Sequence, residues 1–95
     1  METDDPPSIG TIIARIAHLL KEQGLNPDGA SEPGLLLRYV NAGRTAELLE
    51  TESPKQFNGQ FVDEHGAEHR TRYVVSNGVE KIAVEKITRF LETGT

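Results

Sequence analysis

The sequence contains no cysteine and no tryptophan, and its only aromatic residues are three phenylalanines and two tyrosines among 95 residues. Without cysteine there is no disulfide framework, thiolate zinc ribbon or thiol nucleophile, which suits the reducing cytoplasm. No apolar run is longer than three residues, as in Leu35 to Leu37, whereas a transmembrane helix needs about 20. We therefore expect a cytoplasmic protein without a membrane span.

Positive charge is also scarce, because ten Lys and Arg residues stand against fifteen Asp and Glu residues, a formal net charge of −5. This balance disfavours a general nucleic-acid or anionic-membrane binder, since both need a positive surface. The first seven residues carry three carboxylates and two prolines, where a signal peptide would be basic. We expect a disordered acidic tail over residues 1–8 and a single domain over residues 9–95.

The segment 9–23 has the clearest periodicity in the chain. Apolar residues recur there at intervals of three and four, which predicts an amphipathic helix. Ser8 is a favourable N-cap and Gly24 a favourable residue just beyond the C-terminus. The apolar positions are Ile9, Ile12, Ile13, Ile16, Leu19 and Leu20.

The segment 35–52 fits two structures. As a hairpin, it has strands at 35–40 and 44–51 joined by a turn at 41–43; as a helix, it has a rough apolar stripe. Gly43 costs about 1 kcal/mol in a helix interior but nothing in a turn, so we favour the hairpin. Two further strands are predicted at 57–62 and 67–75, around the turn 63–66.

The segment 79–92 also fits two structures. Its periodicity favours a helix capped by Asn77 and ended by Gly94, whereas its β-branched residues favour a strand. Asn77-Gly78 is a strong hairpin signal, so we interpret this segment as a closing strand. The predicted fold is α+β, with an N-terminal helix packed on a small, strongly bent antiparallel sheet or barrel of the Sm/SH3 type. The alternative is a winged-helix-like arrangement with helices at 9–23, 35–51 and 79–93 and a hairpin at 57–75.

No catalytic constellation stands out in the sequence. Residues 65–69, His-Gly-Ala-Glu-His, match the letters of the inverted zinc-protease motif, in which His65 and His69 would bind zinc and Glu68 would act as the base. Gly66 and the hairpin context argue against the helix that this motif needs. The pairs Asp4-Asp5 and Asp63-Glu64 are expected in water. We predict no enzyme, no cofactor and no metal site.

A basic strip near aromatic residues supports an alternative function, binding of RNA or DNA by a small barrel or winged domain. The net charge disfavours this function, and the aromatic residues fit the core equally well. The strip consists of Arg70, Arg72, Lys81, Lys86 and Arg89, beside Phe57, Phe61 and Tyr73.

Residues 82–90, with the sequence IAVEKITRF, resemble the last strand of small Sm-like barrels. They are most similar to the Rof family of Rho-termination inhibitors, in which a hydrophobic-x-hydrophobic-acid-Lys-Ile-Thr stretch closes the barrel. Residues 73–75 resemble the preceding strand, and residues 37–46 resemble the first Sm hairpin. The resemblance implies a helix followed by a barrel, and a bacterial, cytoplasmic regulator of transcription that acts on a protein.

An acidic surface fits that mode of action, because it can occupy a cationic nucleic-acid channel on a partner and speed association electrostatically. The same carboxylates also fit a simpler role in solubility. We predict a non-enzymatic regulatory module that docks through an acidic face on a larger protein, one that handles nucleic acid. An exposed sheet edge could also pair with the same edge of a second copy to form a homodimer. The candidate acidic residues are Glu47, Glu50, Glu52, Asp63, Glu64 and Glu68.

Overall fold

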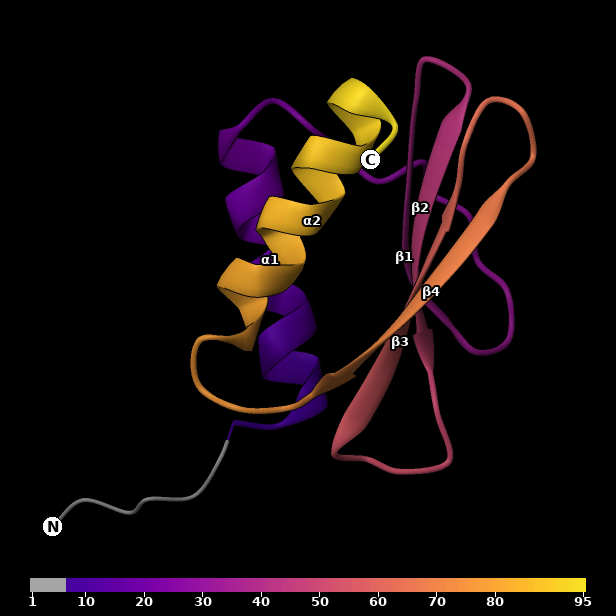
Figure 1. The fold of residues 1–95 in the computed structure, drawn as a ribbon. Coiled ribbons are helices and arrows are strands. Elements are labelled where there is room, and N and C mark those ends of the chain that lie inside the picture. The colour runs from indigo at the N-terminus through magenta and orange to yellow at the C-terminus, as the bar shows by residue number, and fades with distance from the viewer. Residues whose placement is uncertain (1–6) are drawn as a thin grey trace, which may run out of the picture.

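The computed structural model describes residues 7–95, so the predicted tail over 1–8 lies mostly outside the described residues. Two helices cover one face of a four-stranded antiparallel sheet of order β1-β2-β3-β4 (Figure 1). Within residues 7–95, neither helix is long and apolar enough to cross a membrane. The elements are α1 (Ile9–Glu22), β1 (Leu35–Asn41), β2 (Arg44–Glu50), β3 (Gln56–Val62), β4 (Glu68–Val74) and α2 (Val79–Thr93).

Helix α1 confirms the prediction from apolar periodicity. The Ser8 hydroxyl accepts a hydrogen bond from the Thr11 backbone N–H at 3.1 Å, which satisfies one free donor of the first turn. Ile12, Ile16 and Leu20 are fully buried, so one side of the helix faces the core.

The β1–β2 hairpin is also confirmed, and the helix at 35–51 in the winged-helix alternative is wrong. Ala42 and Gly43 both have positive φ, at 54° and 78°, as a two-residue turn between twisted strands requires. Asn41 pairs with Arg44 across this turn. Ala46 on β2 faces the core together with Tyr39 on β1, its cross-strand partner.

Strands β3 and β4 lie where the sequence predicted them. The core side of β3 carries Phe57, Gly59 and Phe61, each buried, and Tyr73 stacks on Phe57 with ring centroids 5.1 Å apart. A Cβ on Gly59 would stand 2.9 Å from Tyr73 Cε2. The same Cβ would stand 3.0 Å from Phe61 Cε2, so the absence of a side chain at this position lets the rings of Tyr73 and Phe61 close over the strand.

The segment 79–92 is not the predicted closing strand, because it forms helix α2. The Asn77-Gly78 pair leads the chain into a helix instead of a hairpin. Gly78 is the N-cap of α2 and has φ 94°. Its backbone N–H donates a hydrogen bond to Glu80 Oε1 at 3.1 Å. Ala83, Ile87 and Phe90 are fully buried on one side of the helix. The 3.6-residue periodicity therefore outweighed the β-branched composition.

The sheet is open, with β1 and β4 as its two edges. The predicted barrel required residues 79–92 to close the sheet, but these residues instead cover its inner face as α2 (Figure 1). The coarser prediction, an α+β domain with the N-terminal helix packed with an antiparallel sheet, is confirmed. The resemblance to Sm-like barrels depended on residues 82–90 as a strand, so it no longer has that support.

Candidate binding surface

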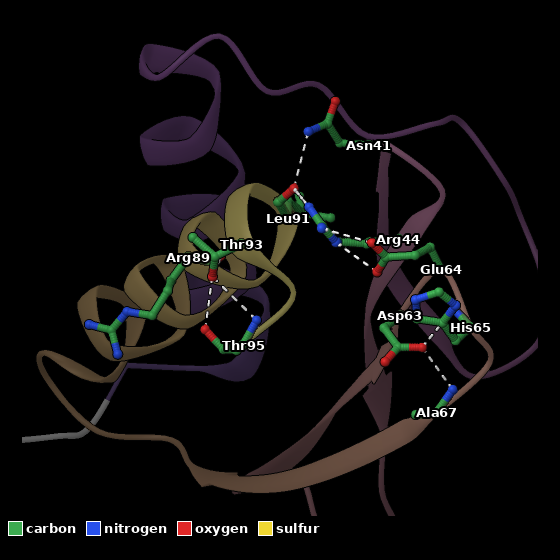
Figure 2. Close-up of polar contacts among 10 residues, drawn as sticks. All are labelled: Asn41, Arg44, Asp63, Glu64, His65, Ala67, Arg89, Leu91, Thr93 and Thr95. Atoms are coloured by element: carbon green, nitrogen blue, oxygen red, sulfur yellow. Dashed lines mark hydrogen bonds and ion pairs between the residues drawn. The ribbon is translucent and has the colours of Figure 1, made fainter.

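The β3–β4 turn is held by the carboxylate at its start (Figure 2). Asp63 Oδ1 accepts hydrogen bonds from the backbone N–H groups of His65 at 2.8 Å and Ala67 at 2.9 Å. The Asp63 N–H donates to the Ala67 carbonyl at 3.0 Å, and the Gly66 N–H donates to the Asp63 carbonyl at 3.0 Å. Four hydrogen bonds therefore fix five consecutive residues.

Glu64 joins this turn to the rest of the molecule through Arg44. The guanidinium binds both carboxylate oxygens, with Nε–Oε1 at 3.0 Å and Nη2–Oε2 at 2.9 Å. Its third nitrogen, Nη1, donates to the carbonyl of Leu91 at 3.1 Å, and Asn41 Nδ2 donates to the same carbonyl at 3.2 Å (Figure 2). The β1–β2 turn, the β3–β4 turn and the last turn of α2 thus share one polar network.

Two carboxylates of the turn are more acidic than usual. Hydrogen bonding from the Ala67 N–H lowers the pKa of Asp63, with a further contribution from the His65 N–H. The hydrogen bond from Arg44 lowers the pKa of Glu64. Both groups are therefore fully ionised at neutral pH. Glu68 begins β4 just beyond the turn, and its Oε1 accepts a hydrogen bond from Gln60 Nε2 at 3.4 Å. We call Asp63, Glu64 and Glu68 the acidic corner.

The other three predicted acidic residues lie elsewhere. Glu47 is paired with Arg38 at 2.6 Å, and this contact is the largest cause of the raised pKa of Arg38. Glu50 and Glu52 lie at the end of β2, where the β2–β3 connection begins, so they are at the opposite end of the sheet from the acidic corner. The six carboxylates therefore do not form one face.

The predicted basic strip is also divided. Arg70 and Arg72 alternate with the buried Tyr73 on β4, so their side chains point away from the helices. Lys81, Lys86 and Arg89 belong to α2 on the other side of the sheet.

The aromatic residues of the strip do not reach the surface. Phe57 and Phe61 are fully buried and Tyr73 is 5% exposed. Lys86 Nζ lies 5.3 Å from the centroid of the Phe61 ring, so the Lys86 side chain covers an edge of the hydrophobic core. An aromatic platform for stacking bases is therefore missing from the described part of the chain.

The histidine motif does not have the geometry of the zinc-protease site, because His65 is in the turn and His69 is on β4 rather than on one helix. Residues 7–95 contain no group of three or more His, Asp or Glu side chains placed to hold a metal ion.

Arg44 is the residue that sequence reasoning missed. It contacts Glu64, 20 positions away, and Leu91, 47 positions away. No local pattern in the sequence marks such a contact.

The fold and this surface define a small α+β domain with an open sheet and a structured acidic corner. Comparisons with protein-family models, with curated proteins and with solved structures found no match to this chain.

Proposed function

We propose that this chain is a non-enzymatic regulatory module that docks through its acidic corner on a cationic surface of a larger protein. The observation that carries the proposal is the hydrogen-bonded β3–β4 turn, which fixes Asp63 and Glu64 in position beside Glu68. Because the turn is already ordered, docking does not incur the conformational entropy of ordering a flexible loop.

The charge of the chain supports a cationic partner. The net charge of −5 favours approach to a positive surface, and electrostatic attraction raises the association rate of complementary proteins. A nucleic-acid channel is a common surface of this kind, so a protein that handles nucleic acid fits the proposal. The specific role that we propose is that of an inhibitor or adaptor of the transcription machinery, as in the Rof family. This role is supported by the negative charge of the chain and does not depend on a shared barrel fold.

Direct nucleic-acid binding is less well supported by the geometry. The five basic candidates are divided between the two faces of the molecule, and the aromatic residues near them are buried. A protein partner therefore remains the better proposal.

The test compares two charge reversals at opposite ends of the sheet. Glu68→Lys changes the acidic corner, and Glu50→Lys is the matched control, because both residues are exposed strand positions. Each immobilised protein is incubated with lysate at about 0.15 M salt and washed to about 1 M, which shortens the screening length from about 8 Å to about 3 Å. Retained proteins are identified by mass spectrometry and the interaction is repeated with the purified partner.

We expect one protein to bind the wild type and Glu50→Lys, to elute with salt, and to be lost with Glu68→Lys. Equal retention by all three proteins, or no retention by the wild type, would contradict the proposal.

A further inference from the structure

The two edges of the sheet differ in their protection. The edge of β1 is covered by the segment 24–34: the Asp28 N–H donates to the Arg38 carbonyl at 2.9 Å, and Arg38 also binds Glu32 at 2.7 Å. Figure 1 shows this segment running beside the sheet. Strand β4 has no such cover within residues 7–95, and every residue of it except Tyr73 is exposed. An uncovered edge strand is a template for another strand.

The hydrogen bonds at both ends of β4 show which of its backbone groups are free. Ala67 and Val75 bond to the β3 side, through Asp63 N–H and the Lys55 carbonyl respectively. In an antiparallel pair these bonds recur at every second residue, so the odd-numbered residues of β4 bond to β3. The even-numbered residues therefore direct their N–H and C=O groups outwards. They are Glu68, Arg70, Arg72 and Val74, and the Val74 carbonyl accepts from the Ser76 hydroxyl at 3.3 Å.

We propose that β4 pairs antiparallel with β4 of a second copy of this chain, which joins two sheets into one of eight strands. The register is centred on Arg70, opposite Arg70 of the second copy. Glu68 of each copy then faces Arg72 of the other, on the side of the sheet away from the helices. The two-fold symmetry forms this ion pair twice, and opposite charges facing each other across strands stabilise the pairing.

Charge and paired length together distinguish this register from its neighbours. Only shifts of two residues keep the outward groups paired, because the intervening residues already bond to β3. One such shift places Arg70 opposite Arg72 twice, which is repulsive. The other places Glu68 opposite Arg70 twice, which is favourable, but Arg72 then lies opposite Gly66, beyond the end of β4, and the paired part of β4 is reduced to residues 68–70. The register centred on Arg70 pairs residues 68–72 of both copies, and its two ion pairs outweigh one contact of like charge between the Arg70 side chains, so it combines length with a net attraction.

The inner side of β4 is also exposed in the monomer. His69 and Thr71 face the helical side but remain exposed. Since the two-fold axis is perpendicular to the joined sheet, the second copy brings its helices to the same side. The register places His69 of each copy opposite Thr71 of the other on this side, so the dimer covers residues of β4 that are exposed in the monomer.

The first experiment measures mass by sedimentation equilibrium for the wild type, Arg72→Ala and Arg72→Pro. Proline at position 72 removes an outward N–H without removing a bond to β3, and proline is tolerated on edge strands in this position. We expect the wild type to have twice the monomer mass of 10.4 kDa. Arg72→Pro should weaken dimerisation more than Arg72→Ala, which keeps the N–H, and by at least about tenfold in Kd.

The second experiment tests the register by exchanging charges. Glu68→Arg and Arg72→Glu alone each place like charges opposite one another, and we expect each to raise Kd about tenfold. The double variant restores both ion pairs with reversed polarity and should return Kd to within about threefold of the wild type. This rescue tests the proposal even if Arg72→Pro fails to fold.

A wild type that stays monomeric up to about 100 μM would overturn the proposal, since a useful dimer has a Kd below that value. A dimer that survives every Arg72 substitution would also overturn it, because its interface would lie elsewhere. Glu68 belongs both to the acidic corner and to the dimer contact, so Glu68→Lys affects both. Arg72→Pro breaks the dimer without changing a residue of the acidic corner, so its behaviour in the lysate experiment separates loss of the dimer from loss of the partner.

Discussion

Replacing Arg44 with alanine should destabilise the domain, although Arg44 is not a hydrophobic core residue. Its side chain is 15% exposed and joins three segments, through two bonds to Glu64 and one to the Leu91 carbonyl. After the substitution, Asn41 remains the only side chain that donates to this carbonyl among the described residues. The last turn of α2 also loses the positive charge that its carbonyl groups favour.

The expected loss follows from these contacts. A hydrogen bond from a charged donor to the Leu91 carbonyl contributes about 1.5 kcal/mol. A positive charge at a helix C-terminus contributes about 0.5 kcal/mol. The Glu64 carboxylate can be hydrated when Arg44 is removed, so breaking this ion pair adds little. The free energy of unfolding should fall by about 2 kcal/mol, a factor of about 30 in the folding equilibrium.

Urea unfolding followed by circular dichroism, at one fixed protein concentration, measures this change. Arg89→Ala is the matched control, since Arg89 is 59% exposed and its ion pair with Glu85 is 3.7 Å long. We expect Arg89→Ala to lower the free energy of unfolding by less than about 0.5 kcal/mol. Arg44→Lys should have an intermediate stability, because lysine keeps the charge but lacks the planar fork with which Arg44 binds both Glu64 oxygens and the Leu91 carbonyl. An Arg44→Ala variant no less stable than Arg89→Ala would refute the reasoning.

Two further predictions concern single polar groups. Tyr39→Phe should raise the free energy of unfolding by about 1 kcal/mol, because the Tyr39 hydroxyl is buried without a partner in the described structure; a lower melting temperature would show that the hydroxyl is satisfied. The lowered pKa values of Asp63 and Glu64 mean that their contribution to stability is complete above the ordinary carboxyl pKa and is lost as pH falls through the folded values. Asp63→Asn should therefore flatten the loss of stability below about pH 4.5, and Glu64→Gln should do so less, because its ion pair with Arg44 is partly exposed to water. An unchanged loss of stability at low pH in Asp63→Asn would contradict this assignment.

Local patterns in the sequence predicted most of the elements. Helix α1 follows from its apolar spacing and its Ser8 cap, both of which depend on residues within a few positions of each other. The β1–β2 hairpin follows from Gly43 at a position that needs positive φ. Strands β3 and β4 were likewise marked by alternation and by the turn between them.

Residues 79–92 could not be assigned locally, because apolar periodicity and β-branched composition favoured different structures. Burial decided between them. As a helix, the segment covers the sheet with Ala83, Ile87 and Phe90, none of which is exposed. As a strand, it would have left that face of the sheet largely in water. The energy of covering a sheet depends on the whole fold, so no local propensity contains it.

For the candidate surface too, the sequence determined some features and the tertiary structure decided the others. The sequence by itself determined the net charge, the acidic turn at Asp63 and Glu64, and the alternation of Arg70 and Arg72 along one strand. Only the tertiary structure decided that Arg44 joins the turn to the end of α2, that the six carboxylates separate, and that β4 rather than β1 is the uncovered edge. Composition and alternation are properties of neighbouring residues, whereas strand order and register bring together residues that the chain holds far apart.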